Sequence, residues 1–382
     1  MLRRLLWGAL GAAALFIIAA TGWIWSLPPA RSFAAPTPIA QAERDATIAA
    51  LKPPKRSRPL IAIIGINDAT ETTDYLMPYG ILKRADVADV VTLATVPGPV
   101  TLYPTLKVEP QATIAAFDAQ HPDGADYVIV PAMSRDDDPA ALQWIRQQAS
   151  KGAIVIGVCV GAVVVGEAGL LDGKRGTTHW YSVKELRGRL PTMRYVEDRR
   201  IVVDGRVATT TGISASMPMA LTLVEAIAGS DKAHAVGRDI GVLEWDERHE
   251  SDAFSFTRPF ALTAIGNSAA FWAHEDLGIE LKDGVDEVSL ALAADAWSRT
   301  YRSRAVTFAA TAEPRQSRSG MRIYPDVVAA NWPAERLPEP VGDLKPSEAL
   351  DETLRAIEAR YGARTTDFVA MQLEYPRSRA AD

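Results

Sequence analysis

The chain has 382 residues, of which 48% are hydrophobic and 23% charged, a composition typical of a folded protein of one large or two modest domains. Its formal net charge of −6 leaves no basic footprint for nucleic acid, so direct nucleic-acid binding is not expected. The single cysteine, Cys159, excludes an internal disulfide, so stability must come from the packed core.

The N-terminus carries an apolar stretch, residues 5–25, of about the length that spans a bilayer. Arg3 and Arg4 precede it, and Trp23 and Trp25 would lie at the far interface. The distribution of positive charge would place the rest of the chain on the exported side of a cell membrane. The sequence therefore predicts a single-pass membrane protein.

We assign this transmembrane anchor to residues 1–26 and a proline-rich tether with one short helix to residues 27–58. The alternative is a signal peptide that is cleaved near the small residues at 32–35, which would give a secreted protein.

Strand-like apolar runs then alternate with helical segments of about ten residues. The predicted strands are 59–65, 90–95, 106–108, 127–131 and 153–158, and the predicted helices are 74–84, 111–120, 139–151 and 162–168. This alternation is typical of βα units around a parallel sheet, in which ligands bind beyond the carboxyl ends of the strands.

Cys159 follows the predicted strand 153–158 directly and precedes a short helix of small residues. The thiol is therefore expected in a sharp strand-to-helix turn, where Gly161 avoids a collision with the strand. The helix N-terminus would favour thiolate over thiol, which makes Cys159 a candidate nucleophile. The alternative is a buried cysteine that acts as a small hydrophobic residue.

Three blocks occur in a defined order: ATETTDYLMPYGIL, CVGAVVVGEAGLLDGKRGTTHW and VATTTGISASMPMALTLVEAIAG. Together they resemble the ThiJ/PfpI superfamily over about residues 59–241, and most of all its branch of isonitrile hydratases and ligand-binding domains of AraC-type regulators. The resemblance implies an α/β fold of the class I glutamine amidotransferase type, a parallel-sheet, flavodoxin-like sandwich with a nucleophile-elbow cysteine.

Asp74 matches an acidic position that hydratases of the family use beside the cysteine. A carboxyl group close to the sulfur would have a raised pKa and could move a proton to or from the substrate. Asp74 could instead cap the helix that follows, and Glu71 is the substitute if the register shifts.

His179 lies twenty positions after Cys159, a separation at which some family members place a histidine near the thiol. It would activate the thiol or pair with the thiolate, while a structural histidine is the alternative. In protease-like members a histidine follows the cysteine directly, and here Val160 stands in its place. A peptidase of the Cys-His type is therefore not expected.

Family members carry Pro-Gly-Gly after the third strand, where this chain has Pro-Ala-Met at 131–133. The backbone amides of Ala132 and Val160, in the same region as Gly161, are the expected oxyanion donors. Met133 would instead fill the pocket of a sensor or an inactive relative.

Thr211 and Ser214 fall in a segment that lines the pocket in the family, so both are candidate binding residues. Capping of the helix predicted at 218–228 is the preferred alternative for Ser214 or Ser216. No cofactor is predicted, and the spacing of the histidines and acidic residues after position 241 indicates no metal site.

Residues 242–382 are predicted to form a smaller α/β domain that echoes the first one. A shift of 215 positions brings matching residues together without a gap: Asp68, Arg84, Val91, Thr92, Ala94, Pro99 and Pro110 meet Asp283, Arg299, Val306, Thr307, Ala309, Pro314 and Pro325. A fainter echo relates residues 227–240 to 360–373. The hypothesis is a shortened, inert second copy, since Asp74 corresponds to Ser289; a chance match is the alternative.

Two classes of function remain open from the sequence. The first is a cysteine-dependent hydrolase or hydratase that acts on a small electrophile such as an isonitrile, an amide or a reactive aldehyde. The second is a non-catalytic small-molecule sensor, and a redox or aldehyde-stress protein with a sacrificial Cys159 is a further alternative. Expected partners are a small molecule, the membrane, and a second copy in a homo-oligomer or within one chain as a pseudo-dimer.

Overall fold

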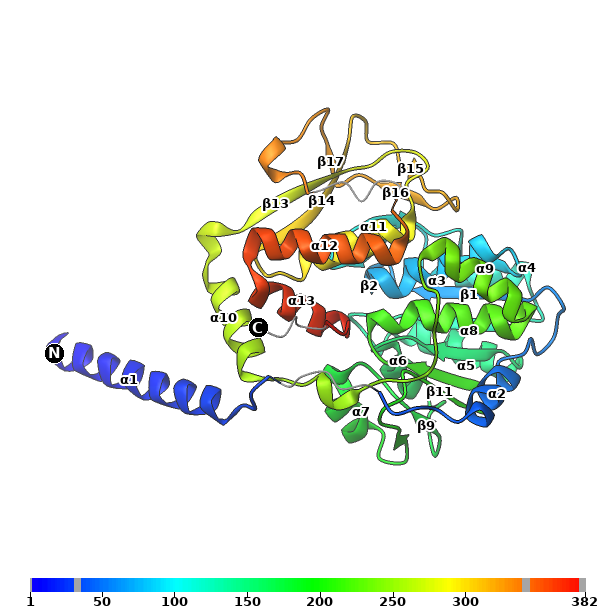
Figure 1. Ribbon diagram of the computed structural model, residues 1–382, viewed down its shortest axis with the longest axis horizontal. Coiled ribbons are helices and arrows are strands. Elements are labelled where there is room, and N and C mark those ends of the chain that lie inside the picture. Colours follow the sequence, from blue (N-terminus) through cyan, green and yellow to red (C-terminus); the bar gives the residue numbers. More distant parts are fainter. Residues whose placement is uncertain (1, 31–35, 339–343, 378–382) are drawn as a thin grey trace.

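The computed structural model describes residues 2–30, 36–338 and 344–377, and a seven-stranded sheet forms its centre (Figure 1). In order across the sheet, the strands are β11 (Ile201–Asp204), β12 (Val207–Thr210), β8 (Ile154–Gly157), β7 (Tyr127–Val130), β1 (Leu60–Gly65), β3 (Asp89–Ala94) and β6 (Ala112–Thr113). All neighbours are parallel except β11, which is antiparallel to β12. The sheet is therefore mixed, and the α/β flavodoxin-like prediction is confirmed.

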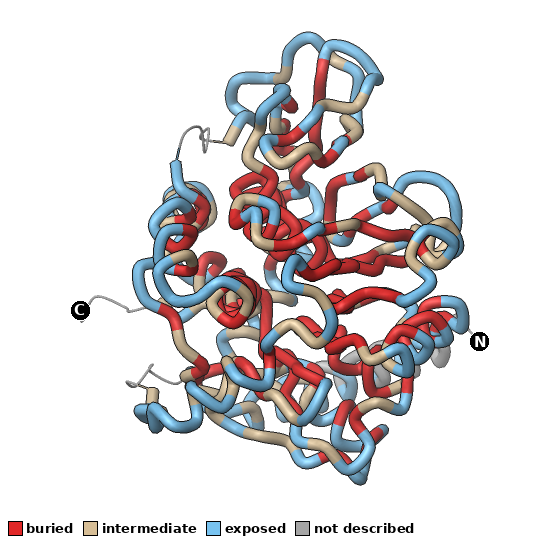
Figure 2. The backbone as a smooth tube through the Cα atoms, turned by 90° about the vertical axis from the view of Figure 1, so that its right-hand side faces the viewer, coloured by how far each residue is buried: buried red, intermediate tan, exposed pale blue. Residues whose placement is uncertain are grey.

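Helices cover both faces of this sheet. They are α3 (Thr72–Ala85), α4 (Ile114–Gln120), α5 (Pro139–Ser150), α6 (Gly161–Glu167), α7 (Val183–Arg189), α8 (Ser216–Ala228) and α9 (Ser230–Ile240). Along β1, Ile61 and Ile63 enter one core while Ala62 and Ile64 enter the other, as the alternation of a strand requires. The buried backbone of the central strands is visible in Figure 2. Burial on both faces explains why the strands read as continuous apolar runs.

The C-terminal part adds a parallel three-stranded sheet with its own helices. Its elements are α10 (Arg258–Ala269), β13 (Glu275–Glu280), α11 (Glu287–Ser298), β14 (Ser303–Ala309), β17 (Val327–Val328), α12 (Pro346–Tyr361) and α13 (Ala363–Leu373). These elements repeat N-terminal ones in the same order, with one shift for the strands and a smaller one for the last helices. Strand β13, the counterpart of β1, lies 215 positions after it, and helix α13, the counterpart of α9, lies 133 positions after it.

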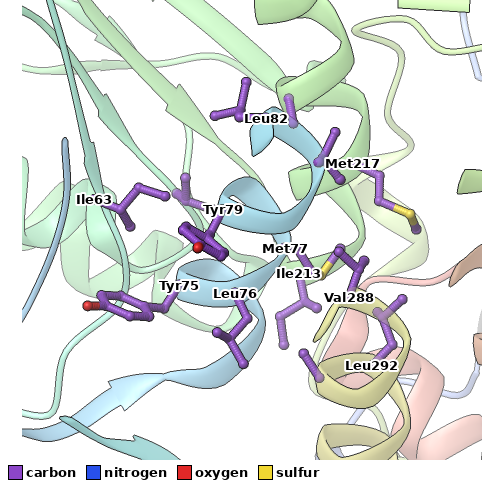
Figure 3. Packing of buried hydrophobic residues seen from close by; sticks show 14 of the residues in the cluster. Ile63, Tyr75, Leu76, Met77, Tyr79, Leu82, Ile213, Met217, Val288 and Leu292 are labelled. Carbon is purple, nitrogen blue, oxygen red and sulfur yellow. The ribbon is translucent and has the colours of Figure 1, made fainter. Parts of the chain in front are cut away.

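The two parts share one sheet and one core. A five-stranded sheet joins β15 (Arg315–Gln316) and β16 (Arg322–Tyr324) to β5 (Lys107–Glu109), β4 (Val100–Tyr103) and β2 (Asp68–Glu71). A separate two-stranded sheet lies wholly within the N-terminal part and pairs β9 (Arg175–Gly176) with β10 (Arg194–Tyr195). Figure 3 shows side chains of α3, Met77 among them, directed toward Val288 and Leu292 of α11. The C-terminal part is therefore packed against the first part and does not stand apart from it.

The segment predicted as a membrane anchor forms the helix α1 (Leu2–Ser26), which projects from the body of the molecule (Figure 1). Within the residues that the structure describes, no helix combines the length and the apolar character that crossing a bilayer requires. The predicted transmembrane anchor therefore lacks support from the structure. Location and the alternative of a cleaved signal peptide stay predictions.

The predicted tether is bound to the folded body, apart from residues 31–35, which lie outside the described residues. Its helix α2 (Gln41–Ala50) contacts α8, and Arg44 donates to Glu225 at 2.8 Å. Leu51 is fully buried, and its carbonyl accepts a hydrogen bond of 2.7 Å from the Tyr127 hydroxyl. The expectation of an extended spacer is wrong because this segment carries an apolar side chain and arginines that find partners on the domain.

We expect Gly80→Ala to destabilise the protein, because a Cβ at Gly80 would lie 2.5 Å from both Glu287 Oε1 and Val288 Cγ2 on α11. The free energy of unfolding in urea should fall by about 1–3 kcal/mol. Gly266→Ala in α10 is the matched control, since no atom lies within 4 Å of its Cβ position. That change should raise the free energy of unfolding by about 0.5–1 kcal/mol through helix propensity. Equal effects of both changes would contradict close packing of α3 on α11.

Candidate active site

Cys159 lies in the turn between β8 and α6 with a φ of +56°, a left-handed backbone conformation that non-glycine residues rarely adopt. The turn is crowded, because a Cβ on Gly161 would lie 2.0 Å from the Val130 carbonyl oxygen. Glycine is therefore required two residues after the cysteine. The predicted strand-to-helix elbow has the strained geometry associated with exposed nucleophiles.

Two threonines hold the elbow. The Cys159 amide donates to Thr210 Oγ1 at 3.1 Å, and the Thr178 hydroxyl donates to the Cys159 carbonyl at 3.0 Å. The backbone of Cys159 is thus fixed by neighbours on β12 and on the loop before His179. This support compensates for the strain in the turn.

A pocket of about 630 Å³ opens over Cys159, whose side chain is 4% exposed. Aromatic and other apolar side chains form most of its wall. The lining residues are Ala69, Glu71, Tyr103, Ala132, Met133, Ser134, Cys159, Val160, His179, Trp180, Tyr181, Ile213, Phe256, Phe260, Ala264, Arg299, Tyr301 and Gln372. Met133 lines this pocket without closing it.

Glu71 and Asp74 form a buried carboxyl pair at the start of α3. Glu71 is the N-cap, and its Oε2 accepts from the Asp74 amide at 2.6 Å and from the Thr73 hydroxyl at 2.7 Å. The alternative in which Asp74 caps the helix is therefore wrong. Asp74 is 0% exposed, its Oδ2 accepts from the Ala132 amide at 3.1 Å, and its Oδ1 has no hydrogen-bond partner among the described residues.

Arg299 of α11 is the cation beside this pair, and it bonds to Glu71. Arg299 donates to Glu71 Oε1 at 2.9 Å and to Asp295 Oδ2 at 2.7 Å. Burial and the charge of Glu71 raise the pKa of Asp74 well above its ordinary value, while burial raises the pKa of Glu71 to about 7. Asp74 is thus the group that retains a proton, and its free Oδ1 can carry it.

The Cys159 thiol has a raised pKa, chiefly because it is buried and further because the carboxyl groups of Asp74, Glu71 and Glu374 lie near it. Only the hydrogen bond from the Val160 amide acts in the opposite direction among the main influences. Burial and these carboxyl groups therefore oppose the thiolate that the N-terminus of helix α6, seven residues long, was expected to favour.

His179 lines the pocket, but backbone groups occupy both ring nitrogens. Nε2 lies 2.9 Å from the Gln372 carbonyl oxygen, and Nδ1 accepts from the Tyr181 amide at 3.2 Å. Burial also lowers the pKa of His179, which keeps the ring neutral. The ring therefore has no free lone pair for the thiol, and the geometry favours the structural alternative.

Of the three backbone amides predicted near the oxyanion, two already have acceptors within the protein and one points at the sulfur. The Ala132 amide already donates to Asp74, so it does not face a substrate oxygen. The Val160 amide points at the sulfur of Cys159, and the Gly161 amide donates to the Val158 carbonyl at 2.7 Å. Val160 is the predicted donor that remains at the reacting atom.

Thr211 and Ser214 lie outside the pocket lining. The Thr211 amide donates to the Arg200 carbonyl at 3.0 Å, and the Ser214 hydroxyl donates to the Glu374 carbonyl at 2.6 Å. Helix α8 has no side-chain cap, so the preferred capping role of Ser214 or Ser216 is also wrong. Ser214 instead fastens the C-terminal segment to the elbow region.

Sequence reasoning missed the residues that the C-terminal part contributes. Arg299, Tyr301 and Gln372 line the pocket, and buried Glu374 accepts from the Gly212 amide at 2.7 Å. The shift of 215 positions marked Arg299 as the counterpart of Arg84 but gave no sign of its contact with Glu71. Among the described residues, no group of three or more His, Cys, Asp or Glu side chains could hold a metal ion.

We expect iodoacetamide to alkylate Cys159, the only thiol, with an apparent pKa above the ordinary value of 9.0. Glu71→Gln should lower this apparent pKa and speed labelling, because it removes a negative charge and leaves Arg299 less compensated. The rate is measured by mass spectrometry from pH 6 to 11.

Glu185→Gln on α7 is the control, since Glu185 makes only an exposed ion pair with Arg189. An apparent pKa below about 8.5 in the unmodified protein would contradict the buried, carboxylate-flanked environment of the thiol.

Comparison with known proteins relates the part of the chain around the elbow to a known family. Residues 61–226 match the model of the DJ-1/PfpI family. The isonitrile hydratase of Pseudomonas putida is 42% identical over 102 residues, which are 26% of this chain and 42% of the hydratase. The HTH-type transcriptional regulator CdhR of Pseudomonas aeruginosa is 35% identical over 86 residues, 22% of this chain and 25% of the regulator.

The crystal structure of Drosophila melanogaster DJ-1beta aligns with a TM-score of 0.44 at 21% identity, over 48% of this chain and 98% of that one. The chain matches less than half the length of the hydratase and a quarter of the regulator. The resemblance predicted for about residues 59–241 is confirmed. Residues 61–226 form a DJ-1/PfpI family domain.

Proposed function

We propose that the protein is a cysteine-dependent hydratase of small apolar electrophiles, with isonitriles as the first substrate class to test. The observation that carries the proposal is an elbow thiol, Cys159, that lines an apolar pocket, with the carboxyl group of Asp74 close enough to raise the pKa of the thiol. Asp74 itself is fully buried and lies outside the pocket lining, so its role is to exchange a proton with the sulfur. A neutral thiol and a neutral acid are suited to a substrate that needs both a nucleophile and a proton. An isonitrile carbon is such a substrate.

The reaction balances as addition of one water. The Cys159 sulfur bonds to the isonitrile carbon, and the thiol proton reaches that carbon through Asp74, which gives a thioimidate. Water then adds to the same carbon while nitrogen takes a proton. The carbon–sulfur bond breaks, sulfur regains its proton, and an N-substituted formamide leaves.

The pocket wall supports an uncharged substrate. Arg299 is the only arginine or lysine among the described residues that line it, and two carboxylates already pair with Arg299. Phe256, Phe260 and Tyr301 offer ring surface for an apolar substituent. The isonitrile hydratase of Pseudomonas putida among the relatives supports the same substrate class.

A ligand sensor is the second candidate. The raised pKa of Cys159 and the occupied Ala132 amide favour it, because both reduce the capacity for acyl-transfer chemistry that needs thiolate and an oxyanion hole. The relative CdhR is a transcriptional regulator, which supports small-molecule binding as an alternative use of the pocket. Binding without turnover would identify this candidate.

We expect the full chain to convert an apolar isonitrile such as cyclohexyl isonitrile to its formamide, measured by loss of the isonitrile infrared band and by chromatography. Cys159→Ala should abolish turnover because no carbon–sulfur bond can form. Asp74→Asn should reduce kcat by about 10²–10⁴-fold, because the proton carrier is lost.

Iodoacetamide labelling of Asp74→Asn is the control that the thiol and pocket are intact, and His179→Gln should retain more activity than Asp74→Asn because its ring serves the backbone. Turnover that persists in Cys159→Ala would exclude the proposed mechanism.

A further inference from the structure

The N-terminal and C-terminal parts are related by an internal pseudo-two-fold axis. Strand β5 pairs antiparallel with its own counterpart β16, with Val108 opposite Ile323. Lys107 lies opposite Tyr324, and Glu109 lies opposite Arg322. Because Arg322 is the counterpart of Lys107 and Tyr324 that of Glu109, exchanging the two copies converts one pair into the other. Such self-complementary pairing is the mark of an isologous interface between two subunits.

Pairing within each copy has the same register. Leu93 pairs with Ala112 between β3 and β6, and Phe308 pairs with Val327 between β14 and β17, each 215 positions later. Gly362, with a φ of +84°, separates α12 from α13 as Gly229, with a φ of +87°, separates α8 from α9. The C-terminal part therefore repeats both ends of the N-terminal fold and lacks its middle.

The ion pairs across the interface are also reciprocal. Arg299 of α11 donates to Glu71, the N-cap of α3. Its counterpart Arg84 of α3 donates to Asp286, the N-cap of α11. Each of the two helices thus donates one guanidinium to the N-cap of the other, as the helices of two identical subunits would.

The axis also relates the cysteine pocket to a second pocket of about 500 Å³ that is lined by Arg84, Asp239 and Arg318. Their counterparts Arg299, Gln372 and Tyr103 line the cysteine pocket. The second pocket has no cysteine, because the C-terminal copy lacks the elbow. One of the two equivalent sites has therefore lost its nucleophile.

We infer that the C-terminal copy acts as a built-in second subunit and that Arg299 is the positioning residue through which it completes the Cys159 site. The inference rests on the proposed role of Cys159 as the reacting group. Arg299 reaches the site only because α11 packs on α3, and it comes from a position 140 residues beyond the elbow. A chain without this copy would leave Glu71 without its guanidinium.

Arg299 acts on the titratable groups that surround the thiol. These are the carboxyl groups of Glu71 and Asp74 at the start of α3, of Asp295 on α11 and of Glu374 at the end of α13, while His179 is neutral. Although burial opposes its charge, Asp295 and Glu71 raise the pKa of Arg299 and keep it protonated. By stabilising Glu71 as the carboxylate, Arg299 leaves the proton of the carboxyl pair on Asp74.

The test compares Arg299→Gln with Arg84→Gln, which breaks the equivalent ion pair on the side that has no cysteine. Both changes remove one buried guanidinium from the α3–α11 interface, so both should reduce stability. The readout is the rate of Cys159 alkylation by iodoacetamide from pH 7 to 11, which requires no substrate. Failure of isonitrile turnover therefore leaves this test intact.

Arg299→Gln should slow alkylation at pH 9 by about three- to tenfold and raise the apparent pKa, because the thiolate loses its nearby cation. Arg299→Lys should restore the rate to within about twofold, and Arg84→Gln should leave it within about twofold of the unmodified chain. An unchanged rate in Arg299→Gln, or equal slowing in Arg84→Gln, would overturn the inference.

If either single variant fails to fold, the double variants Glu71→Gln with Arg299→Gln and Asp286→Asn with Arg84→Gln replace them, since each removes both members of one ion pair between α3 and α11. The first double variant should label about three- to tenfold more slowly than Glu71→Gln alone at pH 9. The second should match the unmodified chain. Equal rates for Glu71→Gln and its double variant would likewise overturn the inference.

Discussion

Three carboxyl groups and one guanidinium are buried together at the start of α3, and the chemistry of the site depends on this imbalance. Arg299 pairs with Glu71 and Asp295, which leaves Asp74 without a cation of its own. A buried carboxylate without a partner is too costly, so Asp74 is stable there as the acid. The interface between α3 and α11 thus determines which group carries the proton.

The same imbalance determines the state of the nucleophile. Negative charge and burial hold Cys159 as the thiol, although its backbone has the strained geometry of an elbow. A thiolate mechanism would require a compensating cation at the sulfur, and Arg299 is already shared between two carboxylates. Addition of a neutral thiol, assisted by a neutral acid, is therefore more consistent with the site than attack by a preformed thiolate.

The sequence predicted what depends on local pattern. Alternating apolar runs located β1, β3, β7 and β8, and the elbow was recognised from Cys159 and Gly161, because a crowded turn requires small residues. It did not predict the contacts of Arg299 or Glu374, since these join residues more than 150 positions apart. The sequence left the catalytic and the structural role of His179 open, because it does not reveal the carbonyl at Gln372 that occupies the ring.

The truncation of the second copy follows the demands of an isologous interface. The retained elements are the counterparts of β1, β3 to β6, α3, α8 and α9, which supply the paired strands and the packed helices at the axis. The lost counterparts are those of β7, β8, α6 and β12, which build an elbow and contribute little to the interface. Losing the second elbow removes one site without exposing the core of the other. Arg84, the counterpart of Arg299, is retained although its side has no elbow. It still donates across the axis to Asp286, beside a pocket with no thiol.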